Sequence, residues 1–109
     1  MFKIAMPLTA LLLITTVNTQ SAQACQAEAQ VIAPIARIEK SMTSCRVFID
    51  PTQVRFFASS IVCPLDLSEI VSEGVEVGLQ NGHDCKADVG TDLNGVVVRP
   101  LMTGRLVLE

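Results

Sequence analysis

Four cysteines are spread almost evenly over the last 85 residues of this 109-residue chain, and they restrict its fold more than any other feature. They are Cys25, Cys45, Cys63 and Cys85, at intervals of 20, 18 and 22 residues. A zinc site built on C-x-x-C pairs needs much closer cysteines, and the chain has one histidine. An even number of cysteines in a small exported domain predicts two disulfide bonds, which help to stabilise a modest core.

Residues 1–24 have the three parts of a secretory signal peptide. Lys3 supplies the positive charge, Leu8 to Val17 is an apolar run, and Ala22-Gln23-Ala24 is a small-x-small cleavage site. Ten apolar residues rise about 15 Å as a helix, half of what a bilayer core requires, so we expect no transmembrane span. We predict cleavage before Cys25, a single disulfide-stabilised β domain over residues 25–109, and a periplasmic or extracellular location.

Cys25 also allows a second interpretation, because a lipoprotein signal places an acylated cysteine at the first mature position. Such a signal carries a Leu-like residue three positions earlier, where this chain has Ala22. Acylation of Cys25 would also leave one of the other three cysteines unpaired. We therefore favour a disulfide at Cys25 and keep a lipid anchor as the alternative.

The charge balance limits the class of partner. Without Lys3 the chain has seven basic and eleven acidic residues, a net charge of −4, and no run of basic residues. Nucleic-acid binding depends on positive charge, so we expect no nucleic-acid partner.

The first half of the predicted domain is rich in strand-forming residues. Residues 28–40 form one such run, which Pro34 interrupts at a bend or an exposed edge. Residues 45–49 and 54–62 form two more, joined by a turn at Asp50-Pro51-Thr52-Gln53. Three consecutive runs of this kind predict an antiparallel meander.

One helix is predicted after these strands. Asp66 is a good N-cap and Glu69 completes a capping box, while Leu65 and Ile70 have the spacing of a hydrophobic staple. Gly74 ends the helix after about two turns.

Strand character then returns. Residues 75–79 alternate, Asn81-Gly82 forms a turn, residues 83–95 form a polar loop, and residues 96–99 and 105–108 form a final hairpin around residues 100–104.

The resulting order is three strands, a short helix, and two or three strands. It predicts a mainly β fold: a small five- or six-stranded OB-like barrel with one short helix between strands three and four. A β-sandwich or an α+β roll has the same order. The similarity lies in order and size, so no family is assigned.

The barrel topology predicts how the cysteines pair. In a meander, the start of strand two and the end of strand three lie at the same end of the sheet, which brings Cys45 to Cys63. Strand four of such a barrel pairs antiparallel with strand one, which brings Cys85 towards Cys25. A local alternative staples the helix to the following strand through Cys63 and Cys85, and then Cys25 pairs with Cys45.

The sequence contains no assembled catalytic site. His83 is the one imidazole, the thiols are expected to be paired, and no G-x-S-x-G motif occurs. Glu69, Glu73 and Glu76 are carboxylates, and we expect them to be ordinary solvated side chains. We predict no catalytic residues and no cofactor.

Two weak binding features remain. Phe48 is expected in the core, whereas Phe56 and Phe57 face opposite sides of a strand, so one of them is a candidate stacking surface for a ligand. Four oxygen-bearing side chains in the polar loop are candidate calcium ligands, although their spacing does not match the D-x-[DN]-x-[DN]-G motif and no metal is predicted: Asp84, Asp88, Asp92 and Asn94.

These observations favour an exported, non-catalytic binding or interaction module that recognises a protein or a small polar ligand. One alternative is a secreted inhibitor of a hydrolase, which would insert an exposed loop at residues 81–95 or 99–105. Another is a small enzyme that uses carboxylates and His83.

Overall fold

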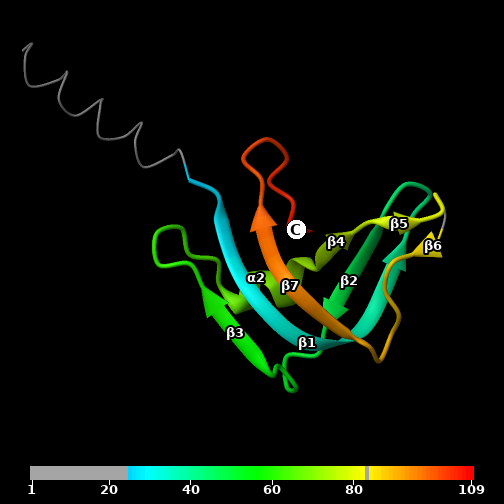
Figure 1. Cartoon of the computed structure of the whole chain (residues 1–109), viewed down its shortest axis with the longest axis horizontal. Helices are drawn as coiled ribbons and strands as arrows, with labels where there is room; N and C mark the ends of the chain where they lie inside the picture. The colour runs from blue at the N-terminus through cyan, green and yellow to red at the C-terminus, as the bar shows by residue number, and fades with distance from the viewer. Residues whose placement is uncertain (1–24, 83) are drawn as a thin grey trace, which may run out of the picture.

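A computed structural model describes residues 25–82 and 84–109; the expected signal peptide, residues 1–24, and His83 lie outside the described residues. Five strands close a barrel in the order β1-β2-β4-β8-β7 and back to β1 (Figure 1). The strands of this wall are β1 (Ala27–Lys40), β2 (Cys45–Ile49), β4 (Val75–Val77), β7 (Asp92–Arg99) and β8 (Val107–Leu108). The predicted small, mainly β barrel is confirmed.

Counted along the chain, the wall strands follow the circuit 1-2-3-5-4, which is the Greek-key circuit of the OB barrel. The helix α2 (Leu67–Glu73) does lie between the third and fourth strands of the chain, as predicted. However, the third strand, β3 (Phe56–Ser59), stays outside the wall. The helix therefore connects the second and third wall strands.

β1 is a long, bent strand that organises the barrel. One edge pairs with β7 from Ala27 to Pro34. On its other edge it pairs with β3 and then, further along, with β2. Pro34 lies between these two partners, where the ladder is interrupted, so its missing N–H removes no hydrogen bond. The bend predicted at Pro34 coincides with a register shift between Ile35 and Arg37.

The predicted meander is wrong at its third strand. The turn after β2 forms as expected, with Gln53 N–H donating to the Asp50 carbonyl at 3.2 Å and Thr52 N–H to the Asp50 carboxylate at 2.9 Å. The chain does not reverse there. It continues along the same edge of β1, so that β3 pairs with β1 and not with β2. β3 therefore ends beside the N-terminal end of β1.

This direction explains why both predicted disulfide pairings are wrong. The structure joins Cys25 to Cys63 and Cys45 to Cys85, with Cα–Cα distances of 6.0 and 5.7 Å. Cys63 follows β3 and lies at the start of β1, next to Cys25, instead of returning to Cys45. This is the third of the three possible arrangements. It replaces both the favoured pairing, Cys45–Cys63 with Cys25–Cys85, and the alternative, Cys25–Cys45 with Cys63–Cys85.

The helix forms where its sequence signals predicted it. Asp66 N–H donates to the Glu69 carboxylate at 3.0 Å, as a capping box requires, and Leu65 and Ile70 are fully buried. Gly74 ends the helix with a φ of 75°. A Cβ at this glycine would lie 2.8 Å from Arg46 Cγ and from the Phe48 ring, so the helix end packs closely against β2.

The polar segment predicted at residues 83–95 is more ordered than expected. The Asn81-Gly82 turn joins β5 (Leu79–Gln80) to β6 (Asp84–Cys85), and β7 already begins at Asp92. The loop thus shrinks to a few residues. The final hairpin is confirmed as the antiparallel pair of β7 and β8, although β8 is shorter than predicted.

Alternate side chains of the wall strands fill the barrel. The interior includes Val31 and Ile35 of β1, Val47 of β2 and Val97 of β7, together with Ile70 from the helix. Phe48 is not in this core, contrary to expectation. It points outward from β2, half-buried, and the Arg37 guanidinium lies 4.0 Å from its ring centroid.

Candidate binding groove

The barrel wall has a seam where β4 meets β8. The two strands run parallel and share one residue pair, Glu76 with Val107, and Glu76 N–H donates to the Leu106 carbonyl at 2.9 Å. Both strands are short, so they separate beyond this pair. The opening holds a groove of about 390 Å³, which we call the seam groove; it is lined by Thr43, Ser44, Glu76, Val77, Gly78, Arg105, Val107 and Leu108.

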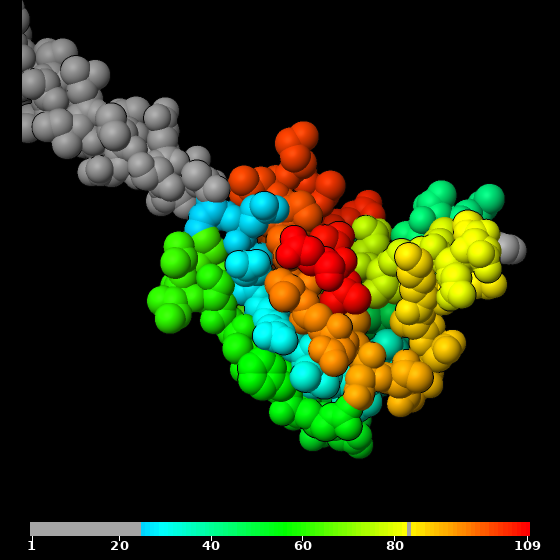
Figure 2. Space-filling model, viewed as in Figure 1, coloured from blue at the N-terminus to red at the C-terminus, as the bar shows by residue number. Residues whose placement is uncertain are grey.

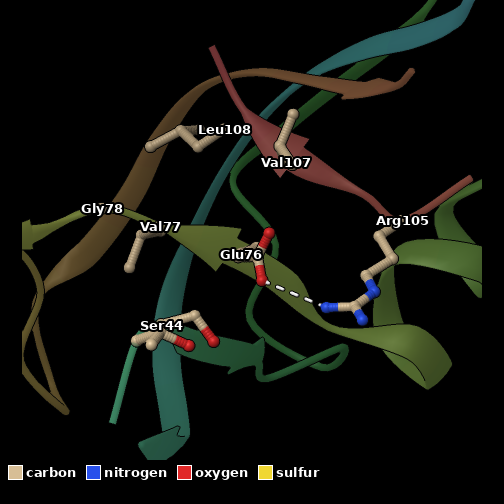
Figure 3. A pocket seen from close by; sticks show the side chains of 8 residues that line it. Ser44, Glu76, Val77, Gly78, Arg105, Val107 and Leu108 are labelled. Atoms are coloured by element: carbon tan, nitrogen blue, oxygen red, sulfur yellow. Dashed lines mark ion pairs between the residues drawn. The ribbon is translucent and has the colours of Figure 1, made fainter. Parts of the chain in front are cut away.

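The seam groove has sides of different chemistry (Figure 3). Ser44 and its neighbour Thr43, from the β1–β2 turn, supply hydroxyl groups on one side. Val107 and Leu108, on β8, form an aliphatic side across from them. The Glu76 carboxylate lies between these sides and faces Arg105.

The ion pair in the seam groove is loose. Arg105 Nη1 lies 3.6 Å from Glu76 Oε1, and the Arg105 side chain is 63% exposed whereas that of Glu76 is 26% exposed. An ion pair at this distance whose arginine is exposed to solvent contributes little to stability. Both charges can therefore exchange their present partner for a ligand at small cost.

Arg99, by contrast, forms close ion pairs that hold parts of the fold together. Arg99 donates to both carboxylate oxygens of Glu73 at 2.9 and 2.8 Å, to Glu69 at 2.9 Å and to the Gly104 carbonyl at 2.6 Å. The Arg99 hydrogen bonds hold the pKa of Glu73 below its usual value, and Glu73 in turn raises the pKa of Arg99. These contacts fix the helix to the end of β7.

The expectation that three carboxylates would be ordinary solvated side chains is therefore wrong. Glu69 and Glu73 are bound to Arg99, and Glu76 lines the seam groove opposite Arg105. Their sequence spacing on a helix and a following strand gave no sign of this, because each arginine partner lies about 30 residues further along the chain.

The candidate stacking residues lie on β3, outside the seam groove. Phe56 is 44% exposed, and Phe57 is partly buried against the core, so the prediction that one ring is exposed is confirmed. A smaller hollow of about 210 Å³ lies where β3, β1 and β7 run side by side, and neither ring lines it. A role of Phe56 or Phe57 in binding stays a prediction.

The candidate calcium ligands do not come together. Asp84 lies in β6, Asp88 lies in the loop, and Asp92 and Asn94 lie in β7. Asp92 forms an ion pair with Arg55. Within residues 25–82 and 84–109, no group of three or more acidic, histidine or cysteine side chains could hold a metal ion.

The Cys25 sulfur is bonded to Cys63, so it is unavailable for the thioether bond of a lipid anchor in this form of the protein. In the part of the chain that the structure describes, no helix has the length and apolar character needed to cross a membrane.

The chain was compared with protein-family models, curated proteins and solved structures, and none of them matches it.

Proposed function

We propose that residues 1–24 direct this chain out of the cytoplasm, and that the barrel acts there as a non-catalytic binding module whose ligand occupies the seam groove. The observation that carries this proposal is the loose pair of a half-buried Glu76 and an exposed Arg105 inside a groove. A pair that contributes little to stability is available to a ligand. The two disulfides support the location, because such bonds persist in oxidising compartments.

The position of the seam groove supports the same function by analogy with the fold. OB barrels bind their ligands on the face of strands two and three and on the loops that connect strands one to two and four to five. The seam groove is lined by the corresponding parts of this chain: the β1–β2 turn, the end of β4 and the β7–β8 connection. This is an argument from architecture, and the groove's own chemistry determines the ligand.

That chemistry favours a segment of a protein or a small polar ligand. The groove offers one carboxylate, one guanidinium, two hydroxyls and an aliphatic side, and no aromatic ring lines it. Sugars and bases are usually held by stacking on aromatic rings. A polypeptide segment, by contrast, presents polar backbone groups and apolar side chains together.

Affinity capture from the periplasm or culture medium, followed by mass spectrometry, tests the proposal. We expect wild type to retain a partner and Arg105→Glu to lose it, because the variant places two carboxylates face to face in the groove. The matched control is Arg37→Glu, which reverses an exposed charge outside the groove. Equal capture by both variants would remove the seam groove from the proposal. A captured hydrolase that loses activity in the complex would identify the module as an inhibitor.

A further inference from the structure

The seam groove places a hydrogen-bond donor beside an acceptor. Arg105 Nη1 and Glu76 Oε1 lie 3.6 Å apart, and the exposed Arg105 side chain can turn towards a ligand. A guanidinium offers a planar fork of N–H donors that matches a carboxylate, whereas an ionised carboxylate only accepts hydrogen bonds. A ligand that satisfies both groups at once therefore carries an anion and an N–H donor close together.

The last residue of a polypeptide has this combination. Its carboxylate, its backbone N–H and its side chain are all attached to one carbon atom. Val107 and Leu108 form the aliphatic side of the groove near the ion pair, where an apolar side chain would be removed from water. A phosphate, by contrast, has no N–H to offer Glu76, and an amine has no anion for Arg105.

We infer that the seam groove recognises the C-terminal residue of a partner polypeptide. The carboxylate of that residue binds Arg105, its N–H donates to Glu76, and its apolar side chain packs on Val107 and Leu108. The inference rests on the proposed function and specifies which part of the partner enters the groove. Charge-assisted hydrogen bonds are about 2.7–2.9 Å long, so each charge of the pair gains a closer partner than its present one at 3.6 Å.

A ligand carboxylate needs compensation, because the groove already holds Glu76. Arg46 lies directly opposite Glu76 in the ladder of β2 and β4. Lys86 lies at the other end of the strand, where its Nζ is 3.8 Å from the place that a Cβ on Gly78 would occupy. With Arg105, three basic side chains thus approach a strand that carries one carboxylate. Positive charge around β4 therefore offsets the repulsion between Glu76 and the ligand.

The length of the groove favours a polypeptide over a free amino acid. It extends over residues 76–78, about 7 Å of extended chain, and passes the hydroxyls of Thr43 and Ser44 (Figure 3). These hydroxyls and the Lys86 ammonium can donate to the carbonyls that precede a C-terminal residue, and a free amino acid has no such carbonyls. Figure 2 shows the red C-terminal residues beside yellow-green β4 on the outer surface, where a partner can reach them.

A library of acetylated tetrapeptides of random sequence tests this inference on the immobilised, oxidised protein. Half of the library ends in a free carboxylate and half in an amide, and mass spectrometry identifies the retained peptides. We expect free-carboxylate peptides to be enriched at least about tenfold over amides, because the amide lacks the charge that Arg105 binds. Valine, leucine, isoleucine and methionine should predominate at the last position of the retained peptides.

Two variants connect this preference to the groove. Arg105→Gln should lose the preference for a free carboxylate, because glutamine keeps an N–H donor without the charge. The matched control, Arg37→Gln, removes an exposed arginine charge outside the groove and should keep the preference.

Three results would overturn the inference: no retained peptides, equal retention of carboxylates and amides by wild type, or an unchanged preference in Arg105→Gln. Free leucine that displaces the peptides as effectively as an acetylated tetrapeptide ending in leucine would also overturn it, because the ligand would then be an amino acid. A captured protein that Arg105→Glu fails to bind, together with no carboxylate preference, would refute C-terminal recognition and leave the proposed function standing. Capture unaffected by Arg105→Glu would refute the seam groove itself.

Discussion

The Arg99 guanidinium donates to both carboxylate oxygens of Glu73, at 2.9 and 2.8 Å, and so joins the last residue of β7 to the last residue of α2. The same arginine also reaches Glu69 and the Gly104 carbonyl. A short helix of seven residues has little stability of its own, so its position depends on contacts of this kind.

Arg99→Lys is expected to destabilise the barrel by about 1–3 kcal/mol, because lysine cannot reproduce the forked contacts and leaves two neighbouring carboxylates less compensated. Thermal or urea unfolding of the oxidised protein measures this. The matched control is Arg55→Lys, whose exposed ion pair with Asp92 should contribute less than about 1 kcal/mol. Equal losses in the two variants would show that the Arg99 contacts do not fix the helix.

Low pH is expected to lower the free energy of unfolding, because it protonates the Glu73 carboxylate. Its pKa is lowered in the folded state, chiefly by the hydrogen bonds from Arg99, so its contribution to stability is complete above its ordinary pKa of 4.5. The contribution is lost as the pH falls through the folded-state pKa. Glu73→Gln and Arg99→Gln should both make the unfolding free energy fall less steeply below about pH 4.5. If the unfolding free energy falls with pH as steeply in both variants as in wild type, the Glu73–Arg99 pair is not the source of the acid sensitivity.

Gly74→Ala is expected to destabilise the protein by more than about 2 kcal/mol, because it combines a φ of 75° with a Cβ that would lie 2.8 Å from Arg46 and Phe48. Gly82→Ala is the control: its φ is 80°, but no atom lies within 4 Å of the added carbon. The difference in unfolding free energy between the two variants measures the packing at the helix end. A difference near zero would mean that the helix end moves away easily.

Mass spectrometry of a non-reduced digest should recover peptides joined through Cys25–Cys63 and Cys45–Cys85. The bonds span separations of 38 and 40 residues, so the loop-entropy account gives each about 4 kcal/mol. Paired serine variants of either bond should therefore lose similar unfolding free energy. A disulfide-linked peptide that joins Cys45 to Cys63 would contradict this structure and support the meander predicted from the sequence.

Local signals predicted the helix well and the sheet less well. Asp66, Glu69 and Gly74 act within a few residues of one another, so the helix ends where they indicate. The turn at Asp50 is equally local, but its sequence does not show whether the chain reverses or continues along the same partner. That choice depends on β1, which offers a second stretch of the same edge beyond Pro34. Because the direction of the chain after this one turn was predicted wrongly, both disulfides of the favoured pairing were predicted wrongly too.

The seam groove could not be predicted from the sequence, for a similar reason. Its lining comes from residues 43–44, residues 76–78, and residue 105 with residues 107–108, three segments that approach only because the barrel closes. Glu76 and Arg105 each lie in stretches that resemble ordinary exposed strand and loop. The exposed phenylalanine, in contrast, followed directly from the alternation of β3.

The two crosslinks interleave along the chain: the bond that begins at Cys25 ends between the two cysteines of the other. Any single peptide-bond cut between residues 25 and 85 therefore yields two pieces that remain covalently joined. Pairing Cys25 with Cys45 and Cys63 with Cys85 would have left residues 46–62 unprotected, and a cut there would have released two fragments. A protease that cuts the oxidised protein once between residues 25 and 85 therefore cannot release a free fragment, and the two pieces stay together for the barrel to close again around the break.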